Sequence, residues 1–293
     1  MDQDVSYLLD ILSFQRDLGV SSSCLEHDSN SVCFEKNDIT NNFKELCRLT
    51  ASGTTLQVAL RDCSDKKNTI RKPSVATKVV AKKHASYGGI VEEVYSQVDK
   101  INNLDQLKQY ILDFDKCKLK LGTTNTVICD GQPTAKIMLI GEAPGEKEDL
   151  RGIPFCGKSG LLLDEVLLSI GVKRSSNIYI SNSVFWKPPG NRKPTDEEIA
   201  ICKPLVEKHI SLIAPSLLLP CGATALQTLL AMNGITKLTG VFFDYNNRYL
   251  NSPIKAMPIF HPAFLLRNPI SKKTMWGNML LVKEYCLTNG ISL

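Results

Sequence analysis

Short, uninterrupted apolar runs alternate with segments of helical periodicity along the C-terminal part of the sequence. The runs predict buried strands, because strands covered on both faces read as continuous apolar segments. The predicted strands are 136–141, 177–184, 216–222, 241–245 and 256–260. The predicted helices are 91–101, 104–114, 158–170, one opening at the T-x-x-E capping box 195–198, 223–232 and 275–287. This alternation favours an α/β fold, a three-layer α/β/α domain with a central, mainly parallel sheet.

The N-terminal part of the chain follows a different pattern. Apolar residues at helical spacing predict an amphipathic helix over residues 1–20, which either docks a partner or packs on its own domain. Residues 21–89 are polar and become rich in lysine, which is typical of a flexible basic linker. We therefore predict three parts: this helix, this linker and a folded domain over residues 90–293.

Composition narrows the class of protein only slightly. A formal net charge of +5 is compatible with a polyanionic partner without requiring one. The sequence has no apolar run of membrane-spanning length and no basic-then-apolar leader, so we expect no membrane partner and a cytoplasmic location. The 10 cysteines are scattered, which indicates reduced thiols rather than a disulfide scaffold.

The segment 137–160 contains a strand, a loop of glycine, proline and carboxylates, and the start of a helix. Open α/β sheets bind their ligands at such places. Residues 152–159 match the phosphate-loop pattern G-x-x-x-x-G-K-[ST] of nucleoside triphosphatases. The context argues against that function, because a long spacer separates Gly152 from the strand and Pro154 lacks an N–H donor. A triphosphatase is therefore a minor alternative.

Four blocks of sequence resemble the family 4 uracil-DNA glycosylases, in the order found in that family. The blocks are GEAPGEKED (141–149), GIPFCGKSGLLLDEVL (152–167), YISNSVFWKPPGNRKPTDEEI (179–199) and HPAFLLRNP (261–269). The resemblance implies a uracil-DNA glycosylase-like catalytic domain over residues 90–293. It also implies a DNA-repair hydrolase that flips uracil out of DNA and hydrolyses its N-glycosidic bond, leaving an abasic site.

The resemblance assigns three residues to the binding of the flipped base. Phe155 is expected to stack on the base in place of its lost neighbours. Asn182 is expected to donate to uracil O4 and to accept from N3–H, a pair of contacts that cytosine reverses. Ala143 is expected beside C5 of the base and the attacking water.

Three further residues are implied in the chemical step. His261 is expected to donate to uracil O2, where negative charge collects as the bond to the sugar breaks. Glu142 and Glu148 are the candidate carboxylates for stabilising the sugar cation and orienting the water. The residues alone leave open which carboxylate handles the water.

The last two blocks also imply contacts with DNA. Leu265, Leu266 and Arg267 resemble the family's wedge, an apolar tip that enters the duplex where the base has left. Lys187 and Arg192 lie among prolines and are expected to contact backbone phosphates. The expected partner is uracil-containing DNA, acted on by a monomer, and other base-excision repair proteins are candidate partners.

The chain departs from the family at its iron–sulfur cluster, which the family holds with four cysteines. The corresponding positions here are Phe114, Cys117, Trp186 and Cys202. A phenyl ring and an indole cannot ligate iron, so we expect no cofactor and an apolar filling of the cluster's space. This loss motivates one more alternative, a catalytically inactive DNA-binding protein of the same fold.

Overall fold

The computed structural model describes residues 87–293, and the predicted N-terminal helix and almost all of the predicted linker lie outside these residues. Six strands form one sheet in the order β1-β3-β2-β4-β6-β5. Their bounds are β1 (Cys129–Gly131), β2 (Ile137–Gly141), β3 (Ile178–Asn182), β4 (Leu217–Pro220), β5 (Phe243–Tyr245) and β6 (Ile254–Ala256). The four inner strands pair in parallel, and β1 and β5 close the edges in antiparallel fashion. The prediction of a mainly parallel sheet is confirmed.

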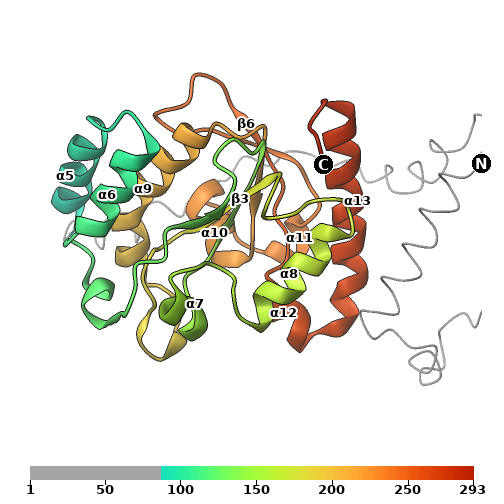
Figure 1. The fold of residues 1–293 in the computed structure, drawn as a ribbon, viewed down its shortest axis with the longest axis horizontal. Coiled ribbons are helices and arrows are strands. Elements are labelled where there is room, and N and C mark those ends of the chain that lie inside the picture. The colour runs from blue at the N-terminus through green and yellow to red at the C-terminus, as the bar shows by residue number, and fades with distance from the viewer. Residues whose placement is uncertain (1–86) are drawn as a thin grey trace, which may run out of the picture. The chain divides into compact units, whose positions relative to one another are not determined.

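Helices flank this sheet on both sides (Figure 1). One group consists of α9 (Asp196–Ile213) and the two helices that pack against it, α5 (Gly88–Val98) and α6 (Leu104–Asp113). A second group contains α8 (Lys158–Leu168), α12 (Pro262–Arg267) and α13 (Lys272–Thr288). The connections contain α7 (Glu146–Arg151), α10 (Ala223–Leu230), α11 (Ile235–Leu238) and the 3-10 turns η3 (Lys118–Gly122), η4 (Pro189–Asn191) and η5 (Pro269–Ser271). Within residues 87–293, no helix has the length and apolar character needed to cross a membrane.

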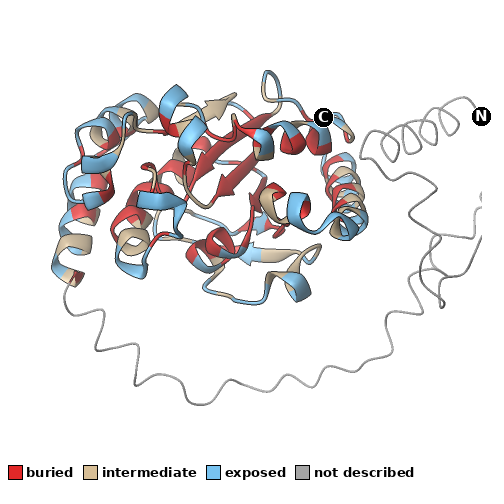
Figure 2. Ribbon diagram, turned by 90° about the horizontal axis from the view of Figure 1, so that it is seen from below, coloured by how far each residue is buried: buried red, intermediate tan, exposed pale blue. Residues whose placement is uncertain are grey.

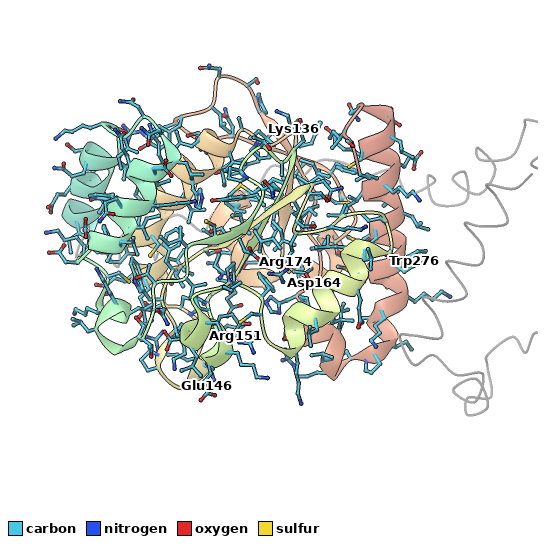
Figure 3. The ribbon with its side chains drawn as sticks, in the orientation of Figure 1. Lys136, Glu146, Arg151, Asp164, Arg174 and Trp276 are labelled. Carbon is cyan, nitrogen blue, oxygen red and sulfur yellow. The ribbon has the colours of Figure 1, made fainter. Side chains whose placement is uncertain are left out.

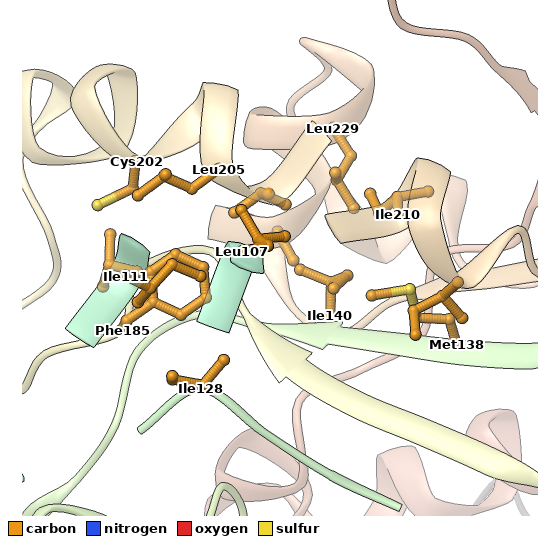
Figure 4. Packing of buried hydrophobic residues seen from close by; sticks show 14 of the residues in the cluster. Leu107, Ile111, Ile128, Met138, Ile140, Phe185, Cys202, Leu205, Ile210 and Leu229 are labelled. Atoms are coloured by element: carbon orange, nitrogen blue, oxygen red, sulfur yellow. The ribbon is translucent and has the colours of Figure 1, made fainter. Parts of the chain in front are cut away.

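Strand β2 is buried along its whole length (Figure 2). Met138 and Ile140 belong to the large core cluster that includes Leu205 and Ile210 of α9 (Figure 4). Ile137 and Leu139 are equally buried but lie outside that cluster. Because successive side chains of a strand point to opposite faces, both faces of the sheet must be covered. The continuous apolar run of β2 is thereby explained.

Local signals predicted some element boundaries well and others poorly. The capping box is present: Glu198 N donates to Thr195 Oγ1, and Thr195 N donates to the Glu198 carboxylate. The predicted strand 256–260 is misplaced, because β6 ends at Ala256. Pro258 has no N–H for the ladder, and only an isolated bridge between Cys221 and Ile259 follows.

His209 of α9 is buried in the core with half of its hydrogen-bonding capacity unused. Its Nε2 lies 2.8 Å from the Tyr179 hydroxyl. Its Nδ1 has no partner within the part of the chain that the structure describes. Burial lowers the pKa of His209 from 6.5 to about 3. The folded protein therefore holds this imidazole in its neutral form.

We predict that His209 makes the fold sensitive to acid. The unfolded chain takes up a proton near pH 6.5 and the folded chain only near 3, so stability is lost as the pH falls through this window. The loss is about 1.4 kcal/mol for each pH unit at a single ideal site. Urea unfolding at roughly pH 7 and roughly pH 5 should therefore show a smaller loss for His209→Gln than for the wild type. Tyr179→Phe keeps the imidazole and serves as the control, and equal losses in H209Q and the wild type would contradict the prediction.

Candidate active site

Parallel pairing brings the C-terminal ends of β2 and β3 side by side. Gly141, the last residue of β2, is the register partner of Asn182, the last residue of β3. A cavity of about 640 Å³ opens at this edge, and Glu142, Phe155, Asn182 and His261 all line it. This volume lies within the range of small-molecule sites. Residues from separate sequence blocks thus meet in one place, and Ala143 and Glu148 line the same cavity.

Phe155 lies against the floor of the cavity. Its ring centroid is 5.5 Å from that of His261. A Cβ added to Gly141 would lie 2.5 Å from Phe155 Cζ and 2.4 Å from Asn182 Oδ1, so only glycine allows this approach. Phe155 has a φ of 51°, a left-handed conformation that is uncommon for residues other than glycine. Strained backbone of this kind persists where the surroundings hold it, often at functional sites.

Asn182 presents to the cavity an amide that has no hydrogen-bond partner among residues 87–293. The residue is 2% exposed, and its side chain makes no hydrogen bond with any residue from 87 to 293. The amide atoms of Asn182 are not among the fully buried atoms that lack a partner, so they are accessible from the cavity. Since Asn182 lines the cavity, the amide is available to a ligand that offers both a donor and an acceptor.

His261 is held in a defined tautomer. The backbone N–H of Ala263 donates to His261 Nδ1 over 3.2 Å, at the start of α12. Burial lowers the pKa of His261 below its ordinary value, so the ring is neutral. A neutral ring that accepts at Nδ1 must carry its proton on Nε2. His261 can therefore act as a neutral hydrogen-bond donor in the cavity.

The two candidate carboxylates have different partners. Glu142 Oε2 accepts from the Thr224 hydroxyl over 2.7 Å. Glu148 Oε1 accepts from the backbone N–H groups of Cys156 and Gly157, over 3.0 and 2.9 Å. Gly157 is the N-cap of α8, so Glu148 caps that helix and holds the loop that carries Phe155. The same contacts argue against the phosphate-loop alternative, because a carboxylate of the chain already takes the N–H donors.

The predicted DNA contacts are only partly supported by position. Leu265, one of the three residues predicted to form the wedge, is fully buried. Its place in α12 turns it to the core, whereas Leu266 is 47% exposed. Arg192 and Arg267 line the cavity, and the Arg192 guanidinium donates to both oxygens of Glu198. Lys187 lies outside the cavity lining, and its Nζ is 3.5 Å from Asp149 Oδ2.

Sequence reasoning missed several residues at the cavity. Lys147 and Lys158 add positive charge to its lining. Lys158 belongs to the discounted phosphate-loop pattern, which was the available signal for a cation near an anionic ligand. Thr224, which holds Glu142, follows β4 and lies outside every sequence block. Only the pairing of β2 with β4 brings these two residues together.

The cluster positions do not fit an iron–sulfur group. Phe114 and Trp186 are buried and stacked, with ring centroids 5.8 Å apart and planes 12° apart. Cys117 and Cys202 are buried beside each other, and a thiol hydrogen bond from Cys202 lowers the pKa of Cys117 and raises that of Cys202. Residues 87–293 contain no group of three or more metal-ligating side chains. Two thiols beside two stacked aromatic rings cannot supply the four thiolates of a cluster.

Comparisons with known proteins decide the family. A family model described as the uracil DNA glycosylase superfamily matches residues 129–279. The chain belongs to this superfamily. The type-4 uracil-DNA glycosylase of Thermotoga maritima is 40% identical over 154 residues, which are 52% of this chain and 77% of that protein. The type-4 uracil-DNA glycosylase of Saccharolobus solfataricus is 34% identical over 198 residues, or 66% and 91% of the two chains. The corresponding protein of Sulfurisphaera tokodaii is 33% identical over 193 residues, or 64% and 87%.

We predict that Gly141→Ala disrupts this site of the glycosylase-family chain. The added methyl group overlaps the Phe155 ring and the Asn182 amide, so both must move. Overpacking of this kind costs about 1–3 kcal/mol of stability. The measurements are the melting temperature and a crystal structure of the variant. Gly277→Ala in α13 is the control, because its Cβ meets nothing within 4 Å and should stabilise the helix by up to about 1 kcal/mol. An unshifted Phe155 in the G141A crystal would refute the prediction.

Proposed function

We propose that this protein is a uracil-DNA glycosylase, which removes uracil from DNA and leaves an abasic site. The observation that carries the proposal is the Asn182 amide, which has no partner among residues 87–293 and lies with the Phe155 ring against Gly141 in the cavity. A flipped base needs an aromatic surface in place of its stacking neighbours and polar groups that read its edge. Membership of the superfamily and the names of the type-4 relatives support the same activity.

Uracil is selected by the orientation of the Asn182 amide. Its N–H donates to uracil O4, and its carbonyl oxygen accepts from uracil N3–H. Cytosine offers an amino donor and an unprotonated N3 at these positions, so it faces two mismatched contacts. A bidentate contact of this type discriminates by about 1–3 kcal/mol. Stacking on Phe155 contributes about 1–3 kcal/mol with any base and therefore adds affinity rather than selectivity.

Bond cleavage uses His261 and Glu142. The C1′–N1 bond breaks with its electron pair on uracil, and the negative charge spreads to O2, where His261 Nε2–H donates to it. Glu142 stabilises the cationic sugar and takes a proton from the water whose oxygen adds to C1′. We assign this role to Glu142 because the Glu148 carboxylate is engaged by two backbone donors. Ala143 lies beside Glu142 and leaves room at uracil C5.

DNA is held by the cations at the cavity and by one exposed leucine. Lys147, Lys158 and Arg267 line the cavity and contact phosphates around the flipped nucleotide. Leu266 enters the space that the base leaves in the duplex. We propose that the protein acts as a monomer in the cytoplasm. Other base-excision repair proteins are candidate partners.

The two residues that contact uracil provide the test of activity. Asn182→Ala and His261→Ala should both abolish release of uracil from single- and double-stranded oligonucleotides, measured by alkaline cleavage at abasic sites. For His261, loss of the donor to a developing anion corresponds to a decrease of about 10²–10³-fold in rate. Asn289→Ala and His209→Gln are matched controls, because both residues lie outside the cavity lining. Full activity of N182A and H261A would refute the site assignment, and an inactive wild type that still binds DNA would favour the DNA-binding alternative.

We also propose that the protein works without an iron–sulfur cluster. Stacked Phe114 and Trp186 fill the space with apolar packing, and the Trp186 indole N–H donates to the Thr126 hydroxyl over 3.0 Å. Apolar burial of this kind stabilises the domain where a cluster would otherwise link its parts.

Iron analysis tests this proposal directly. Protein purified without oxygen should be colourless and should contain far less than one iron per chain. Activity should be unchanged after treatment with an iron chelator, because no described residue of the proposed site depends on iron. A brown protein that holds about four irons per chain, the content of a four-iron cluster, would overturn the proposal.

A further inference from the structure

The loop that presents Phe155 is unusual because its backbone polar groups face two charged side chains of opposite sign. Its N–H groups at Cys156 and Gly157 donate to the Glu148 carboxylate. Its carbonyls at Pro154 and Phe155 both accept from a single guanidinium, that of Arg174. The positive φ of Phe155 turns the chain at this point.

Arg174 comes from the connection between α8 and β3 and lies outside every sequence block that marks the family. Its Nη1 donates to the Pro154 carbonyl over 2.7 Å, and its Nη2 donates to the Phe155 carbonyl over 2.5 Å. Its Nε donates to Asp164 over 2.6 Å, and Nη1 also lies 3.1 Å from Asp130. Figure 3 shows Arg174 next to Asp164 of α8. The two carboxylates therefore fix the guanidinium that holds the loop.

The Phe155 carbonyl also lies close to α8. A Cβ added to Gly160 would lie 1.7 Å from this oxygen, so the helix backbone is in close contact with it. The carbonyl is thus in contact with both the helix and the guanidinium. Because a left-handed phenylalanine is strained, it needs such surroundings to stay in place. The direction of the Phe155 ring depends on this peptide.

We propose that Arg174 is a positioning residue for uracil excision, which sets the Phe155 ring through the two carbonyls on either side of the strained residue. The planar fork of arginine donates to both carbonyls at once, whereas a lysine ammonium at the same place is a single point charge. This inference rests on the proposed function only in that Phe155 stacks on the flipped base. The bracing of the loop itself does not depend on the reaction.

The experiment compares Arg174→Met, Phe155→Ala and the double variant. R174M should lower kcat/KM for uracil-containing DNA by about tenfold to a hundredfold, the range expected for loss of one base stack. It should weaken inhibition by free uracil to a similar degree. The double variant should be no less active than F155A alone, because Arg174 acts through Phe155. Independent, multiplying losses in the double variant would overturn the proposal.

Two further variants separate positioning from general stability. Arg174→Lys keeps the charge that pairs with Asp130 and Asp164 but cannot donate to both carbonyls, so it should fold and still lose activity. Arg248→Met is the matched control, since it removes another paired arginine, 3.1 Å from Asp99 and outside the cavity lining, and should keep full activity. Wild-type activity in R174K would overturn the proposal.

Hydrogen exchange tests the brace without any activity. In R174M the peptide covering residues 152–160 should exchange faster than in the wild type, while peptides from α9 should be unchanged. Unchanged exchange in residues 152–160 would overturn the proposal. If the wild type releases no uracil, the proposed function fails, and the exchange experiment still decides whether Arg174 braces the Phe155 loop.

Discussion

The parallel pairing of β2 with β3 is the constraint on which the site depends. It places the end of each strand at the same edge, with Gly141 opposite Asn182. Gly141 then leaves the space into which the Phe155 ring fits, directly against the Asn182 amide. Base stacking and base reading are therefore coupled through one residue without a side chain. The apolar runs of the two strands have to be buried on both faces for this edge to form, so core packing and the site share one cause.

Charge at this site is used for geometry as well as for chemistry. Glu148 takes the N–H groups of the loop, and Arg174 takes the carbonyls. Each buried backbone group would be costly without such a partner, and a charged partner makes the stronger bond. The loop at Phe155 therefore forms neither helix nor strand and still holds this residue in one place. In contrast, the Glu142 carboxylate accepts from the Thr224 hydroxyl, its one hydrogen bond within residues 87–293, and keeps access to the cavity.

The lost cluster ligands illustrate how one structural device can replace another. The four positions come from the end of α6, the segment before η3, the loop after β3, and α9. An iron–sulfur cluster would link these segments by covalent bonds to thiolates. Here Phe114 stacks on Trp186, and Cys117 and Cys202 remain as two buried thiols. Apolar burial has no strict directionality, so two large rings can fill such a space without preserving ligand geometry.

The sequence by itself indicated the alternation of β2, β3 and β4 with α8, α9 and α10, and the blocks that contain Phe155, Asn182 and His261, but it did not indicate β1. Hydrophobic periodicity and capping signals depend on residues that are close in sequence. They can therefore be recognised from the sequence alone, as the capping box of α9 shows. The sequence also indicated that the aromatic residues Phe114 and Trp186 replace two of the four cysteines that hold the family's cluster. The burial of Leu265 could not be predicted from the sequence, because the orientation of a short helix depends on the elements that it packs against. Only the tertiary structure decided which carboxylate is engaged by the loop and that Arg174 holds Phe155. Residues 155 and 174 belong to different connections, before and after α8, and only the folded chain brings them into contact.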